Sequence, residues 1–144
     1  MNVRKHTSRS AFAWMLLLLC AGLAACSSSP DPKQPRVFFT SPSDGATVTS
    51  PVKITMDAAN FIVEPAGTVR PGAGHLHIMV DTDAVPVGQV VPKDEKHNHY
   101  GQGQKEAELT LSPGTHTLLL QGTDGAHVAL PGEGMTQKIT VTVK

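Results

Sequence analysis

A two-residue alternation of apolar and polar side chains, seen from residue 36 onward, restricts the possible folds more than any other feature. From Val52 to Asp57 every second residue is apolar, and the same alternation recurs from Ile139 to Val143. Because successive side chains of a β-strand point to opposite faces, such runs predict strands with one buried face. We find no stretch with the 3.6-residue apolar spacing of an amphipathic helix.

Turn residues divide these runs into short pieces. Pro42 and Asp44-Gly45 mark one turn, residues 64–74 are rich in Gly and Pro, and residues 85–104 and 123–134 read as irregular loops. About seven short strands separated by such turns predict an all-β fold, an immunoglobulin-like β-sandwich. The expected strands cover residues 36–40, 51–58, 61–63, 75–82, 106–111, 115–121 and 135–143.

The first residues read as a targeting segment. Arg4, Lys5 and Arg9 precede a short apolar run over residues 11–21, which ends in small residues. The ending Leu23-Ala24-Ala25-Cys26 resembles a bacterial lipobox, which implies a signal peptide over residues 1–25 and a lipid-modified Cys26. The alternative is an ordinary signal peptide cleaved near Ala25. By the same resemblance, Ser27 after the cysteine implies an outer-membrane lipoprotein that faces the periplasm.

The remaining chain divides into a tether and one domain. Residues 26–35 are polar and rich in Ser and Pro, which predicts a flexible tether, and residues 36–144 make one domain of ordinary size. Cys20 leaves with the signal peptide and Cys26 carries lipid, so thiolate catalysis and cysteine zinc sites are excluded. Nine Lys and Arg against twelve Asp and Glu from Cys26 onward leave a net charge of −3, which argues against a nucleic-acid partner.

Two histidines stand one residue apart in the stretch GHLHIMVD, residues 74–81. If Leu76, Ile78 and Val80 face the core, then His75 and His77 point away from it. Met79 and Asp81 follow them on that face, where we expect Met79 to be a surface or interface residue. The two histidines lie about 6.6 Å apart along a strand, a span that two imidazoles can close on one metal ion. The alternative is a pair of exposed polar residues on a solvent face.

A second histidine pair favours the metal. His97 and His99 lie in the long irregular region, and His127 follows Asp124-Gly125-Ala126 in another loop. Two such pairs and a loop histidine in a domain without thiols predict a copper or zinc site, in which His75, His77 and at least one of His97 and His99 approach each other. The metal-ligand candidates are His75, His77, His97, His99 and His127.

His116 is not among the metal-ligand candidates, because it shares a strand face with the apolar Leu118 and Leu120. It follows the turn Ser112-Pro113-Gly114. In immunoglobulin-like folds an inward Tyr near this corner bonds to nearby backbone. The position therefore predicts a structural histidine with a backbone hydrogen bond.

Taken together, five motifs resemble a bacterial family of small exported proteins with a domain of unknown function. The resemblance implies export and an immunoglobulin-like sandwich, and it implies no established biochemistry. The chain departs from the family's pattern at Leu76 and Leu130, where the pattern has histidines. The motifs are SPSDGATVTSPVKI, GHLHIMVD, KHNHYGQGQKEAELTL, SPGTHTLLL and TDGAHVALP.

These features predict a non-catalytic envelope module that binds copper or zinc. The alternative is a structural or protein-interaction module without metal, whose partner the sequence does not identify. An enzyme resembling copper/zinc superoxide dismutase is disfavoured, because the mature chain lacks a cysteine pair and has only Arg36 and Arg70. No nucleophile motif is present either.

Overall fold

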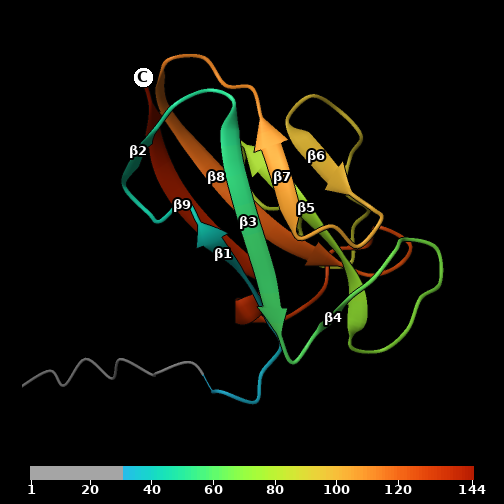
Figure 1. Ribbon diagram of the computed structural model, residues 1–144. Coiled ribbons are helices and arrows are strands. Elements are labelled where there is room, and N and C mark those ends of the chain that lie inside the picture. The colour runs from blue at the N-terminus through green and yellow to red at the C-terminus, as the bar shows by residue number, and fades with distance from the viewer. Residues whose placement is uncertain (1–30) are drawn as a thin grey trace, which may run out of the picture.

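A computed structural model describes residues 31–144 as two packed β-sheets (Figure 1). The predicted all-β, immunoglobulin-like sandwich is confirmed. The first sheet has the order β1-β3-β7, and the second has the order β2-β9-β8-β5-β4, with β6 also paired to β5. The strands are β1 (Arg36–Ser41), β2 (Ala46–Val48), β3 (Val52–Ala59), β4 (Ile62–Val63), β5 (Ala73–Val80), β6 (His97–Tyr100), β7 (Glu106–Leu109), β8 (Gly114–Thr123) and β9 (Thr136–Val143).

The main hydrophobic core lies between the two sheets and follows the alternation of the sequence. Val52, Ile54 and Met56 of β3 are buried, as predicted, and pack with alternate residues of the second sheet. Burial of an aliphatic side chain of this size contributes about 1.5–3 kcal/mol, so this layer supplies much of the stability. The second sheet contributes Leu76, Ile78, Leu118, Leu120, Ile139, Val141 and Val143.

The outer face of β5 is also buried, which corrects the expectation that it faces solvent. Met79, expected at the surface, is 0% exposed and packs with Val85, Val91 and Leu119 in a second, smaller cluster. The segment after β5 folds back over this face. There the buried Gln121 side chain accepts from the Val85 amide at 3.0 Å and donates to the Val85 carbonyl at 2.8 Å. The alternation of side chains within one strand does not show whether a loop from another part of the chain covers the outer face of that strand.

Two short strands were not predicted. β2 lies inside the expected first turn and pairs in parallel with β9, while β6 lies inside the region expected to be irregular and pairs with β5. A η1 turn of 3-10 helix (Glu133–Met135) precedes β9. Within residues 31–144, no helix has the length and apolar character needed to cross a membrane.

The predicted signal peptide and Cys26 lie outside the described residues. The last residues of the predicted tether are described, and they contact the domain. The Asn60 side chain donates to the carbonyl of Pro32 at 2.7 Å and to that of Gln34 at 3.3 Å.

Candidate metal centre

The floor of the candidate site is built by β5. His75 and His77 lie on the same outer face of this strand, and their side chains are buried, with 0% and 2% exposed. Their Nε2 atoms approach to 3.1 Å. Both imidazoles are therefore largely shielded from water.

β6 brings the third imidazole beside the floor. The antiparallel register places His99 directly opposite His77, and the two rings stack with their centroids 4.9 Å apart. The His99 ring lies over Gly101, where a Cβ atom would meet its Nε2 at 2.1 Å. Only glycine leaves the space for this ring orientation. His99 is exposed, so it forms the solvent side of the site.

The loop between β8 and η1 supplies the fourth imidazole. The Asp124 carboxylate accepts from the amides of Ala126 at 2.8 Å and Val128 at 2.9 Å, which closes a tight turn. His127 sits in this turn with a φ of 66°, a left-handed conformation that few residues other than glycine adopt. Its Nδ1 lies 3.0 Å from His75 Nε2.

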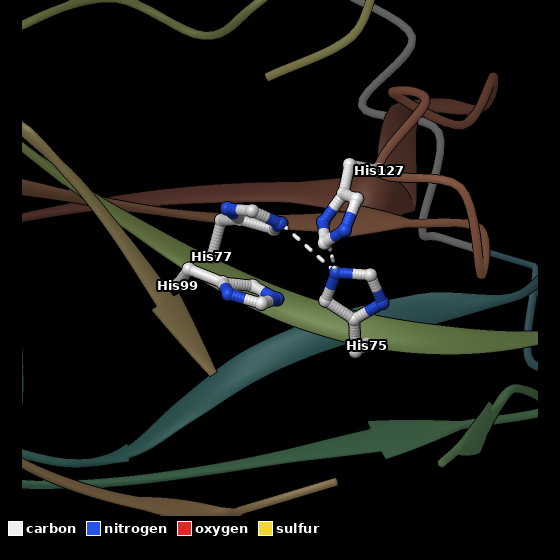
Figure 2. A group of neighbouring side chains, drawn as sticks. All are labelled: His75, His77, His99 and His127. Atoms are coloured by element: carbon white, nitrogen blue, oxygen red, sulfur yellow. Dashed lines mark hydrogen bonds between the residues drawn. The ribbon is translucent and has the colours of Figure 1, made fainter. Parts of the chain in front are cut away.

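The four imidazoles surround one point (Figure 2). One nitrogen from each of His75, His77, His99 and His127 lies within 4.8 Å of every other. Nitrogens that share one ion at about 2.0–2.1 Å lie roughly 3.3 Å apart in a tetrahedron, so inward movements of less than about 1 Å would complete a shell. This group of four histidines can therefore hold a metal ion.

The contacts of His75 Nε2 favour a cation over a purely hydrogen-bonded cluster. This atom lies within 3.2 Å of His77 Nε2, His127 Nδ1 and the Thr123 hydroxyl. A ring nitrogen carries at most one hydrogen, so it cannot satisfy three such neighbours at once. The Nδ1 atoms of His75 and His77 are buried without a hydrogen-bond partner, so the cluster is incompletely satisfied as a polar network.

Burial keeps the floor histidines neutral, which is the form that binds metal. Desolvation, followed by the nearby His127 and His99, lowers the pKa of His75 to about 4. Desolvation, followed by the neighbouring His75, lowers the pKa of His77 to about 3. The pKa of His99 is also lowered, first by desolvation and then by His127 and Lys93. The nitrogens of His75, His77 and His99 are therefore available to a metal at neutral pH without prior deprotonation.

We expect the metal-free fold to lose stability as pH falls below 6.5. The unfolded chain protonates His75 and His77 near their ordinary pKa of 6.5, whereas the folded chain resists protonation until about pH 4 and 3. The stability is therefore present above pH 6.5 and is lost as pH falls through the folded values. Urea unfolding at pH 7, 5.5 and 4.5 measures this, with a His75→Leu/His77→Leu variant as the control. A parent whose pH dependence equals that of the variant would contradict the expectation.

His97 lies outside the group of four. It stands opposite Met79 in the register, two residues along β6 from His99, and its Nδ1 donates to Asp94 Oδ1 at 2.7 Å. The structure thus brings together four of the five candidate ligands, and it meets the expectation that His75 and His77 approach at least one of His97 and His99.

His116 lies at a different corner of the molecule and is held between two acceptors. Its Nδ1 donates to Asp81 Oδ2 at 2.6 Å, and its Nε2 donates to the Ser112 carbonyl at 2.9 Å. The hydrogen bond to backbone was predicted. Both neighbours are acceptors, so they favour the protonated ring, which can donate from both nitrogens, and the hydrogen bond to Asp81 raises the pKa of His116. His116 therefore ties the end of β5 to the turn before β8.

Replacing His116 with Ala should lower the free energy of unfolding by about 1–3 kcal/mol at pH 6, because the partly buried ring loses its hydrogen bonds to Asp81 and Ser112. The loss should shrink at high pH, because the raised pKa makes the contribution full below pH 6.5 and removes it as pH rises through the folded value. Urea unfolding at both pH values measures the effect. An unchanged stability together with lost metal binding would show that His116 belongs to the metal centre instead.

Sequence reasoning missed three residues that support the site, namely Gly101, Thr123 and Asp124. The turn signal Asp124-Gly125 pointed to the last of them, because an Asp at this place commonly bonds to the backbone two residues on. The sequence alone does not reveal these roles of Gly101 and Thr123. Gly101 leaves room for the ring of His99, two residues earlier, and Thr123 meets His75 across the sheet.

Comparison with known proteins gives one match. The model of a family described as "Domain of unknown function (DUF4399)" matches residues 54–144, a segment that contains all four clustered histidines. No curated protein and no solved structure matches the chain.

Proposed function

The chain belongs to the DUF4399 family, a domain of unknown function, and we propose that this domain binds one copper or zinc ion through His75, His77, His99 and His127. The observation that carries the proposal is the convergence of four imidazole nitrogens from three separate segments. Scattered surface histidines have no reason to meet at such distances, and two of these four are buried at a cost in solvation.

The choice of copper or zinc rests on the donor set. Imidazole nitrogens suit zinc and copper, whereas magnesium and calcium prefer oxygen ligands. Met79 carries the sulfur atom of β5, but it is enclosed in the second hydrophobic cluster and does not belong to the group of four histidines. The proposed shell is therefore all nitrogen. One exposed ligand, His99, gives the ion a way in from solvent.

The competing function is a structural or protein-interaction module without metal. It would use the contacts His77–His75 and His75–His127 one at a time, because His75 Nε2 can form a hydrogen bond with either imidazole but not with both at once. Metal analysis of the purified full chain, followed by titration with zinc and copper at pH 7, separates the two. One ion bound per chain supports the metal centre. If neither ion binds, the four histidines form a hydrogen-bonded polar network, and the module without metal is favoured.

We further propose that the domain works in the periplasm, anchored to the outer membrane by lipid on Cys26. The sequence LAAC before the polar segment supports this, and two or more acyl chains would hold the protein firmly where one binds only marginally. The four-histidine centre would then face the periplasm at the membrane surface.

Cys26→Ala should abolish lipid attachment and release the protein from the membrane or leave its precursor uncleaved. Fractionation of cells that produce the parent and the variant, with a gel assay for precursor and mature forms, measures this. Cys20→Ala is the control, because that cysteine lies inside the predicted signal peptide and should change neither property. A Cys26→Ala protein that is processed and fractionates with membranes like the parent would refute the anchor.

A further inference from the structure

A short segment after β4, residues Glu64–Gly67, crosses the candidate metal centre and is called the strap below. Three of its backbone amides donate to three different parts of the chain. The Glu64 amide donates to the Gly74 carbonyl at 2.7 Å, the Ala66 amide to Gly101 at 2.9 Å, and the Gly67 amide to Gly125 at 2.8 Å.

Each acceptor lies beside one of the clustered histidines. Gly74 directly precedes His75, Gly101 follows His99 by two residues, and Gly125 precedes His127 by two residues. The strap therefore bonds to all three segments that supply imidazoles, namely β5, the end of β6 and the loop after β8.

The same glycines allow backbone to approach closely. A Cβ atom on Gly125 would meet the Thr68 carbonyl oxygen at 2.1 Å, so the strap region and the His127 loop touch only because Gly125 has no side chain. A Cβ atom on Gly74 would meet the Thr123 carbonyl oxygen at 1.9 Å. Neither glycine has a positive φ, so the requirement is for space.

The strap is itself fixed at both ends. Before it, β4 pairs in parallel with the start of β5, and after it the Arg70 guanidinium donates to the Glu64 carboxylate. The chain thus leaves the sheet at the end of β4, passes through the strap, and returns to the sheet at Ala73, where β5 begins.

We propose that the strap is the positioning element of the metal centre. This inference rests on the proposed function. His75 and His77 are fixed by the centre of the sheet, whereas His99 sits near the end of an edge strand and His127 sits on a loop. The strap holds these last two segments at the separation that one ion requires. The centre then binds metal without first ordering a loop, which strengthens binding.

The test compares two glycine substitutions in the full chain. Gly125→Ala forces the backbone at Thr68, directly after the strap, from the His127 loop, whereas Gly134→Ala makes a similar backbone clash, at 2.4 Å from the Pro35 carbonyl oxygen. Gly134 lies in η1 and Pro35 directly precedes β1, and neither residue has a hydrogen bond to the strap or to the four histidines. We expect Gly125→Ala to weaken zinc binding by about 10–100-fold, the usual effect of removing an outer support of metal ligands, and Gly134→Ala to leave it unchanged. Equal affinities in Gly125→Ala and the parent would overturn the inference.

A metal-free measurement separates this inference from the metal proposal. The rings of His99 and His127 lie 4.6 Å apart between centroids, close enough for a nuclear Overhauser effect between their ring protons in the parent. Loss of this effect in folded Gly125→Ala supports the strap, and its retention overturns the inference, whether or not the parent binds zinc. If Gly125→Ala does not fold, Gly67→Ala replaces it in both measurements, because Gly67 has a φ of 130° that alanine rarely adopts.

Discussion

A small excess of zinc or copper should raise the thermal midpoint of the full chain by on the order of 15 °C. Metal that binds only the folded state stabilises it by about 4 kcal/mol when free metal is a thousandfold above the Kd. In a domain of this size, each kcal/mol shifts the midpoint by roughly 4 °C. Thermal unfolding with zinc, copper and magnesium measures the shift, and magnesium should have little effect because it prefers oxygen ligands.

Two neighbouring histidines provide a matched pair for this experiment. His99 belongs to the group of four, while His97 lies two residues away on the same strand and bonds to Asp94 instead. His99→Gln should remove most of the metal-dependent shift, and His97→Gln should keep it. The same shift in both variants and the parent would mean that metal binds elsewhere.

The second large effect concerns the metal-free protein. His77→Leu should leave its stability unchanged or raise it by up to about 2 kcal/mol, while abolishing the metal-dependent shift. The imidazole is 2% exposed and its Nδ1 has no partner, so leucine replaces a poorly satisfied polar group with an apolar one of similar size. The substitution removes the unsatisfied Nδ1, and His75 Nε2, which loses its contact with His77, keeps His127 Nδ1 and the Thr123 hydroxyl as partners, so no buried group is newly left unpaired.

Gln121→Leu is the control for that substitution. Gln121 is 1% exposed, and its side chain both donates to and accepts from Val85. Its loss should cost about 1–3 kcal/mol, because the Val85 backbone groups are left unpaired. Urea unfolding compares the two variants. A loss for His77→Leu as large as that for Gln121→Leu would show that the histidine cluster is a structural polar network.

Much of the fold could be predicted from alternation, and the failures have one physical cause. β3 and β9 each bury a single face, so the alternation of apolar and polar residues in their sequences predicts which side chains face the core. β5 is buried on both faces, and its second cover comes from the segment around Val85, which lies beyond its own sequence. The inward face of Leu76 and Ile78 was therefore predicted correctly, while the environment of Met79 was wrong.

The site shows the same division between local and long-range information. The H-x-H spacing places His75 and His77 on one face of a strand whatever the fold, so their approach to each other was predictable. Which of His97 and His99 joins them depends on the register between β5 and β6, and the sequence of either strand alone leaves that open. The strap acts through backbone amides, which leave no side-chain signature.

X-ray absorption of the zinc- or copper-loaded full chain tests the central claim most directly, because it separates sulfur from lighter ligand atoms and counts bound imidazoles by their outer-shell scattering. The account predicts nitrogen neighbours at about 2.0–2.1 Å, with the outer-shell scattering of four imidazoles and no sulfur. Sulfur in the first shell, or the outer-shell scattering of two imidazoles or fewer, would contradict a centre built by His75, His77, His99 and His127.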